Sequence, residues 1–307
     1  MKKILIFMTG LMFMGLVSMG QNEADTAWKV GSKGMLAFSQ STFTNWAAGG
    51  DNTITINGLV DFYARYEKGN KKWENLLVLG FGQTKTGDQL YRKSEDKIDF
   101  LSAYGIKASE KWYYTAGFNF KSQFAPGYDY PDGVDSTRVK ISNFLAPAFI
   151  SFGLGMEYRP IDYFSIYISP ATARWIIVND QELANAGAFG MEKAEYDKLG
   201  EITKEGETSR FEFGAYARIM FVKDIAKNIN LSTKLELFSD YLENPQNVDV
   251  NWDTMINFKV NNWLSANFGL QMIYDDNTPI TDKDGNTGPR TQIKQLLGVG
   301  LTYNVGK

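Results

Sequence analysis

The chain of 307 residues contains no cysteine and no histidine. Without cysteine it has no thiol for a lipid anchor and no disulfide framework. Without histidine it has no imidazole base, which excludes the usual mechanisms of outer-membrane phospholipases, omptin-like proteases and palmitoyltransferases. A zinc site would also lack its two usual ligands. Carboxylate-only catalysis stays formally open, but no carboxylate pair stands out, so we predict no enzymatic activity, no cofactor and no metal.

Long apolar runs and blocks of basic charge are also scarce. Beyond residue 20, no apolar stretch approaches the roughly 20 residues that a membrane-spanning helix requires. The mean hydropathy is -0.28, and the formal net charge is -3. Because no basic block stands out, we expect no nucleic-acid partner.

The N-terminus has the layout of a secretory signal peptide. Lys2 and Lys3 form a positive start, Ile4–Val17 form an apolar core, and small residues occupy positions 18 and 20. We predict a signal peptide over residues 1–20, with cleavage before Gln21. The alternative is a membrane anchor, but the apolar core is shorter than a spanning helix. Export without a lipid anchor leaves the periplasm, the outer membrane or the medium.

Aromatic residues and glycine are plentiful, with 7 Trp, 16 Tyr, 21 Phe and 29 Gly against 8 Pro. Trp73, Trp112 and Trp263 each directly follow a tight polar turn and begin a run of alternating residues, and Trp28 begins another. An amphipathic aromatic ring prefers the boundary between membrane and water. We therefore interpret these four tryptophans as membrane-interface residues in one aromatic girdle.

Apolar and polar residues alternate over twelve segments, most of about 12 to 16 residues, whereas strands of soluble sheets usually have about 5 to 6. Short turns between the segments alternate with longer connections, notably Ala125–Ile141, Asn179–Ser209 and Asp275–Arg290. This pattern predicts an all-β fold, a transmembrane antiparallel up-and-down β-barrel of about 12 strands over residues 21–307. A secreted soluble β-protein is the alternative. The predicted strands are Trp28–Gln40, Asn52–Glu67, Lys72–Thr86, Asp96–Ala108, Trp112–Phe124, Ala148–Tyr158, Tyr163–Val178, Arg210–Val222, Asn228–Tyr241, Asp249–Val260, Trp263–Tyr274 and Thr291–Val305.

The polar faces of these strands carry charges of both signs, which we predict to line the lumen. Charges inside a barrel either line a water-filled path or pair with one another. Their near balance favours pairing, and a barrel of about 12 strands has little free space, so we expect a narrow, gated or closed interior. The lumen-lining candidates are Asp61, Arg65, Glu74, Asp99, Lys107, Lys121, Glu157, Arg174, Arg210, Glu212, Arg218, Lys234, Glu236 and Lys259.

Two loops leave alternatives open. Asp282–Asn286 places Asp and Asn at alternate positions, as a calcium loop does, but its glycine and its twelfth position do not fit; we favour an Asp-Gly hairpin tip. Asp275–Asn277 could bind a cation weakly or be merely solvated. Within the Asn179–Ser209 connection, the runs Glu182–Ala188 and Met191–Leu199 look helical. That connection either folds over the mouth of the barrel or into the lumen, or forms a cover on the surface.

Several segments share a resemblance to one family: Trp46–Gly50, Arg92–Asp96, Lys121–Tyr128, Ile141–Pro147, Leu237–Tyr241 and Ile273–Asp276. Together they resemble a family of unknown function, made up of outer-membrane proteins widespread in Bacteroidetes-type bacteria. The resemblance implies an outer-membrane β-barrel and brings no activity, ligand or catalytic residue with it. The C-terminal residues Gly300, Tyr303 and Val305 also resemble the signal that barrel-assembly machinery recognises.

Two functions from different classes follow. The first is a narrow or gated conduit in the cell outer membrane for a small polar solute. The second is a structural barrel that acts as a platform for partner outer-membrane proteins or lipopolysaccharide. Tight pairing of three arginines with three carboxylates would favour the platform, and separate ladders across an open lumen would favour transport. The pairs are Arg65 with Asp61, Arg210 with Glu212, and Arg218 with Glu236. Outer-membrane lipid and the assembly machinery are expected partners in either case.

Overall fold

The computed structural model describes residues 27–44, 51–131, 133–281 and 286–306. The predicted signal peptide therefore lies outside the described residues. So do the whole of the Trp46–Gly50 segment and all of Asp282–Asn286 except Asn286. In the described part of the chain, no helix is long and apolar enough to cross a membrane.

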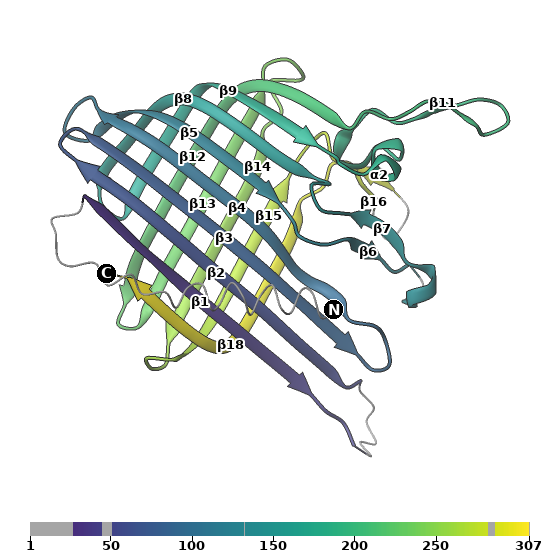
Figure 1. Cartoon of the computed structure of the whole chain (residues 1–307), viewed down its shortest axis with the longest axis horizontal. Coiled ribbons are helices and arrows are strands. Elements are labelled where there is room, and N and C mark those ends of the chain that lie inside the picture. The colour runs from purple at the N-terminus through teal and green to yellow at the C-terminus, as the bar shows by residue number, and fades with distance from the viewer. Residues whose placement is uncertain (1–26, 45–50, 132, 282–285, 307) are drawn as a thin grey trace.

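Twelve antiparallel strands close into one barrel (Figure 1). Eleven of the twelve strand pairings join barrel strands that are consecutive along the chain. The twelfth pairs β1 with β18 and closes the ring. The predicted fold is thus confirmed. The barrel strands are β1 (Trp28–Ser41), β2 (Thr53–Lys68), β3 (Lys71–Thr86), β4 (Arg92–Lys107), β5 (Trp112–Ser122), β8 (Ala148–Ile161), β9 (Phe164–Ile177), β12 (Ser209–Ala226), β13 (Ile229–Asp240), β14 (Asp249–Lys259), β15 (Leu264–Tyr274) and β18 (Gln292–Gly306).

Successive side chains of a strand point to opposite faces, so the alternation in the sequence becomes an apolar outer wall and a polar interior. Phe152, Leu154 and Ile168 are exposed on the outside, whereas Glu157 and Ser169 from the same two strands are buried inside. A belt of exposed apolar side chains around a closed barrel fits lipid and not water.

The four predicted interface tryptophans lie at one end of the barrel, beside the short turns. Trp28 is 5.7 Å from Trp73 and 5.2 Å from Tyr66 between ring centroids. Trp112 is 4.8 Å from Tyr158. Trp263 directly precedes β15 at the same end. The four tryptophans are exposed on the outer wall and form one aromatic band there with the two tyrosines. The assignment of this band to a membrane surface stays a prediction.

Pairing between neighbours extends some strands beyond their predicted ends. β4 begins at Arg92 and not at Asp96, because a bulge keeps its first residues paired with β3. β8 continues to Ile161, so Arg159 lies in a strand and not in the predicted turn. β12 continues to Ala226, which shortens the next predicted turn. These errors arise because hydrogen bonds to a neighbouring strand, and not local sequence, decide where a strand ends.

The long connections gather at the opposite end, where they form small elements of their own (Figure 1). The prediction that Met191–Leu199 is helical is wrong, since this stretch contains β10 and a turn. Glu182–Ala188 is helical only in its first part. The small elements are β6 (Gly127–Asp129), η1 (Asp135–Thr137), β7 (Val139–Ser142), α2 (Gln181–Asn185), η2 (Ala188–Gly190), β10 (Glu195–Tyr196), β11 (Ile202–Lys204), β16 (Ile280–Thr281) and β17 (Thr287–Gly288).

Candidate functional site

The candidate site is the barrel interior. Asp99, Glu212, Arg218 and Glu236 point into it and are each at most 4% exposed. Four further predicted lumen residues lie among them, half-buried. They are Lys121, Arg174, Arg210 and Lys234.

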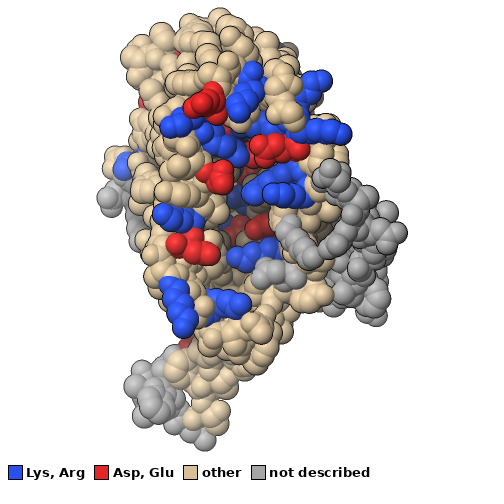
Figure 2. All heavy atoms as spheres, turned by 90° about the vertical axis from the view of Figure 1, so that its left-hand side faces the viewer, with Lys and Arg blue, Asp and Glu red and all other residues tan. Residues whose placement is uncertain are grey.

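The predicted lumen residues near the short turns are more exposed to solvent. Arg65, Lys107 and Lys259 are exposed at the turn end of the barrel. Figure 2 faces this end and shows Lys and Arg interspersed with Asp and Glu around a hollow. The Arg65 guanidinium stacks on Tyr63 at 5.3 Å instead of binding Asp61. Asp61 lies deeper, where one of its carboxylate oxygens is buried and has no hydrogen-bond partner in the described part of the chain.

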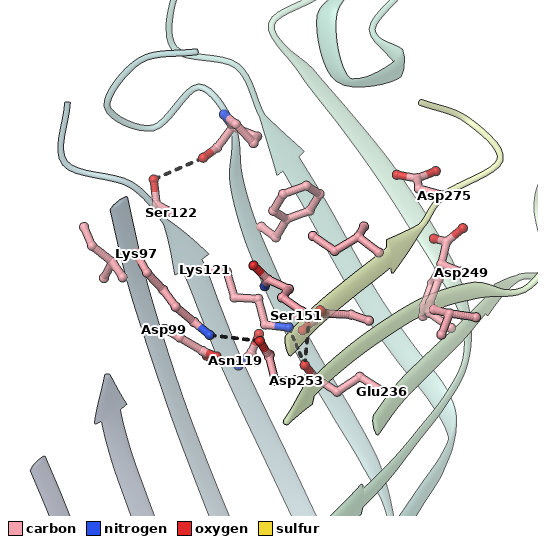
Figure 3. A pocket seen from close by; sticks show the side chains of 18 of the residues that line it. Lys97, Asp99, Asn119, Lys121, Ser122, Ser151, Glu236, Asp249, Asp253 and Asp275 are labelled. Atoms are coloured by element: carbon pink, nitrogen blue, oxygen red, sulfur yellow. Dashed lines mark hydrogen bonds and ion pairs between the residues drawn. The ribbon is translucent and has the colours of Figure 1, made fainter. Parts of the chain in front are cut away.

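The interior is crossed by ion pairs between opposite walls. Lys97 on β4 lies 3.3 Å from Asp253 on β14, and these strands are six positions apart in the ring of twelve. Figure 3 shows Lys97 and Lys121 reaching across from β4 and β5 toward Asp253 and Glu236. A pair that joins opposite walls narrows the interior, because its two side chains fill the diameter between them.

A second set of contacts lies beside this pair. Lys234 on β13 is 2.7 Å from Asp99 and 3.3 Å from Glu236. Lys121 also pairs with Glu236, and the Tyr216 hydroxyl donates to the same carboxylate at 2.7 Å. Burying a charge is costly unless it is paired and hydrogen-bonded, and here each charge has at least one partner. We call Lys97, Asp99, Lys121, Lys234, Glu236 and Asp253 the upper network.

Nearer the short turns, a lower network joins β3 to β8, which are three positions apart. Lys72 and Glu157 form an ion pair at 2.8 Å with side chains 6% and 1% exposed. Arg159 donates two hydrogen bonds of 2.7 Å to the two oxygens of Glu74 and also contacts Glu157 at 3.0 Å. Bidentate arginine–carboxylate contacts are among the strongest in proteins.

Sequence reasoning missed Lys72 and Arg159 as lumen residues. Arg159 was assigned to the turn after the strand Ala148–Tyr158, and Lys72 was placed at the start of a predicted strand without being assigned to the lumen. A signal was available, because each basic residue is two positions from a lumen carboxylate, Glu74 or Glu157, and so shares its face of the strand. Lys97 and Asp253 were missed too. Lys97 shares a face of β4 with the predicted lumen residue Asp99, and Asp253 shares a face of β14 with the predicted lumen residue Lys259.

Only one of the three arginine pairs considered in the sequence forms. Arg210 lies 2.8 Å from Glu212, and Arg174 binds the same carboxylate as well as Asp249. Arg218 does not pair with Glu236; its guanidinium lies 5.3 Å from the ring of Tyr167. The lysines of the upper network occupy Glu236 instead.

The connection between β9 and β12 covers part of the mouth. Leu183, Ala184 and Met191 pack on Ile176 of β9 and on Val178, next to its end. Arg210 inside the barrel donates to the carbonyl oxygen of Gly190 at 3.2 Å. The β10–β11 hairpin instead projects away from the barrel (Figure 1). The α2 part of the connection therefore lies over the mouth as predicted, and the hairpin does not.

Charged contacts fasten the α2 segment to the β6–β7 hairpin. Lys140 lies 2.9 Å from Asp180 and 2.6 Å from Glu182, and Asn143 donates to Asp180 at 2.8 Å. Burial alone would raise the pKa of Asp180, but the hydrogen bonds from Lys140 and Asn143 outweigh it and lower that pKa. The hydrogen bonds to Glu182 and Asp180 raise the pKa of Lys140.

A cavity of about 320 Å³ lies between the upper network and the loop end. Two of its acceptors, Asn251 Oδ1 and Asp253 Oδ2, are buried and have no hydrogen-bond partner among the described residues. A solute that donates hydrogen bonds would satisfy both. Among the described residues no group of three or more carboxylates is placed to hold a metal ion. Other residues lining the cavity include Asn119, Ser151, Phe238, Gln271 and Asp275.

A family model described as a protein of unknown function (DUF3078) matches residues 38–128. Three of the six segments quoted for the family resemblance lie within this region, and the other three lie beyond it. No curated protein matches the chain.

Solved structures similar to the chain include an outer membrane channel, an autotransporter domain and a porin. An outer membrane channel from Pseudomonas putida F1 is 10% identical, with 95% of this chain and 100% of that chain covered and a TM-score of 0.39. The translocator domain of the autotransporter NalP from Neisseria meningitidis is 11% identical, with 98% and 96% covered and a TM-score of 0.34. The NanC porin is 7% identical, with 90% and 97% covered and a TM-score of 0.35.

Proposed function

We propose that this protein is an outer-membrane barrel that passes a small polar solute through a gated interior. The observation that carries the proposal is the cavity of about 320 Å³ whose lining includes residues of the upper network. A solute entering from the loop end would meet hydrogen-bonding groups first and the cross-wall ion pairs next. Those pairs form the gate.

The gate is built so that it can open without leaving a charge unpaired. Glu236 contacts both Lys121 and Lys234, so it keeps one lysine when the other leaves. The Lys97 and Asp253 side chains are 26% and 22% exposed. Water reaches both, which lowers the free energy needed to separate them below the roughly 3–5 kcal/mol of a fully buried pair.

Conductance of the refolded protein in a planar lipid bilayer tests this function. Wild type should show small, intermittent steps, and Lys97→Met should increase the open time because it removes one cross-wall contact. Lys259→Met, at the exposed turn end, is the matched control and should behave like wild type. A folded barrel that is silent in all three forms would refute the conduit.

A structural barrel is the second candidate, and the lower network favours it. Lys72 and Glu157 are almost inaccessible to water, and together with Arg159 and Glu74 they join β3 to β8 near the turn end of the interior. A permanently closed barrel would act through its loops on partner proteins or lipopolysaccharide. This function would be supported by two results together. The folded barrel would show no conductance in the bilayer, and the purified barrel would bind a defined outer-membrane partner.

A further inference from the structure

The barrel wall has a slot where its first and last strands separate. β1 and β18 pair from Gly31 opposite Gly306 to Ala37 opposite Gly300, and no further. β18 nevertheless continues alongside β15 as far as Gln292, and β1 continues alongside β2 as far as Ser41. In Figure 1 the two strands run together near the turn end and diverge toward the loop end.

Burial changes abruptly where the pairing stops. Met35 and Ala37 of β1 are buried, but every residue from Phe38 to Ser41 is exposed. In β18 the segment Gln292–Gln295 is exposed on both faces, which is the pattern of a strand edge with no neighbour. The exposed edges are thus a property of both strands and not of one frayed end.

The slot lies in the half of the apolar belt nearer the loop end. Leu297 pairs with Phe268, which is midway along β15, between Trp263 at the turn end and Tyr274 at the loop end. Ile293 pairs with Met272, close to the loop end. Because short turns face the periplasm in barrels of this class, the slot is level with the outer leaflet.

The slot joins two chemically different surfaces. A cavity of about 360 Å³ fills it and is lined by both lipid-facing and lumen-facing residues. On the lipid side, Phe38 is 52% exposed and Leu297 is 74% exposed. On the lumen side, Ser94 donates to Asn57 at 2.8 Å, with Thr84 nearby in the lining.

On the lumen side of the slot, an ion pair joins β18 to β4. Lys294 of β18 donates to both oxygens of Glu95 on β4, each at 2.9 Å. These strands are four positions apart in the ring, so the contact passes behind the separated edge of β1. Both residues line the slot cavity, and the Lys294 side chain is still 45% exposed. One cation and one anion therefore stand side by side where the slot meets the lumen.

We propose that the slot is a lateral portal that admits a zwitterionic amphiphile from the outer leaflet. The apolar chain would stay on Phe38 and Leu297 in the lipid. The head group would reach the lumen, where its anion would meet Lys294 and its cation Glu95. A phosphoethanolamine head group has this chemistry.

Photo-cross-linking in vesicles tests the portal directly. One phosphatidylethanolamine probe carries a diazirine on its head group, a second carries it in its acyl chain, and the labelled peptides are mapped by mass spectrometry. We expect the head-group probe to label lumen-facing Thr84 and Asn57, and the acyl-chain probe to label outward-facing Phe268. Labelling of Phe268 without Thr84 or Asn57 in the wild-type barrel would overturn the proposal.

Closing the slot provides the matched control. Continuing the register of Ala37 opposite Gly300 would set Ser39 opposite Gly298, so Ser39→Cys with Gly298→Cys closes the slot when oxidised. The chain has no other cysteine. In this slot variant, lumen-side labelling should fall at least tenfold on oxidation and return on reduction. The control variant, Met35→Cys with Thr302→Cys, lies in the paired part of the seam. Oxidation of the control should leave lumen-side labelling unchanged. Equal lumen-side labelling in the oxidised and reduced slot variant would overturn the portal.

The head-group contact has its own variant. Lys294→Gln should lower lumen-side labelling several-fold, and Lys259→Gln at the turn end should not. Undiminished labelling in Lys294→Gln would remove the assigned head-group site. Cross-linking does not depend on conductance, so failure of the portal and failure of the gated conduit are separate results.

Discussion

Lys234 and Asp99 are 135 positions apart in the sequence and five strands apart in the ring, yet their charged groups meet at 2.7 Å inside the barrel. This contact, with its neighbours in the upper network, joins one wall to the other. The charged residues of the interior therefore form a bracing structure across the lumen and not a lining along it. The same charges that would select a solute also hold the barrel together.

The lower network should contribute strongly to stability. Replacing Glu157 by Gln leaves Lys72 buried without its carboxylate, and removing one partner of a buried pair costs about 3–5 kcal/mol in free energy of unfolding. Lys72→Met combined with Glu157→Leu should recover most of this loss, because no charge is left unpaired. Urea unfolding in lipid vesicles measures the difference. Lys204→Ala, which loses only exposed contacts to Glu192 and Glu195, should change stability by less than about 1 kcal/mol.

Arg174 should not tolerate replacement by lysine. Its guanidinium binds Glu212 and Asp249 together and stacks on Phe238 at 3.8 Å. An ammonium group cannot hold two carboxylates in this planar geometry, so Arg174→Lys should lower the free energy of unfolding by about 1–3 kcal/mol. The same urea assay measures it. Stability equal to wild type would show that one of the two carboxylates is satisfied without the arginine.

The seam between β1 and β18 should depend on Gly300. A Cβ atom there would lie 2.2 Å from the carbonyl oxygen of Leu36, so Gly300→Ala should hinder closure of the ring. At Gly298 a Cβ would lie 3.1 Å from the Ala37 side chain, and Gly298→Ala should have a smaller effect. The fraction of folded barrel, read from its heat-modifiable gel mobility, measures both. Equal folding of the two variants would contradict the close contact at Gly300.

Fastening of the α2 segment should weaken in acid. Asp180 has a pKa lowered below its ordinary value of 3.8, so its stabilisation is present above that value and disappears as the pH falls through the lowered pKa. The Lys140 pKa is raised above 10.5, so its contribution is complete below that value and is lost only in strong alkali. A spin label at Asn179→Cys should therefore become more mobile below about pH 4. In Asp180→Asn the label should already be mobile at neutral pH.

The fold was predictable because each strand carries its own signal. The alternation from Ile54 to Tyr66 in β2 fixes two faces through a local rule, and Trp73 and Trp112 mark the turn end. Predicted strand ends were less accurate, as at Arg92 and Ile161, since these depend on how far a neighbouring strand offers hydrogen bonds.

The site was predictable only in part. Alternation placed Asp99, Lys234 and Glu236 on polar faces, but it could not say which residue meets which. The partners of Lys97 and Arg159 come from strands three to six positions away in the ring. Such distances across a barrel depend on its closure and strand tilt, which no single segment encodes.

By itself, the amino-acid sequence determined the all-β class, the number of strands, the two faces of each strand and the end at which the tryptophans lie. These properties follow from a period of two residues and from turn chemistry, which act over a few neighbouring residues. Only the tertiary structure decided that the charges pair across the lumen, that α2 covers part of the mouth and that β1 and β18 separate at Ala37. Those relationships exist only once the ring has closed, because closure sets which distant side chains share the same space.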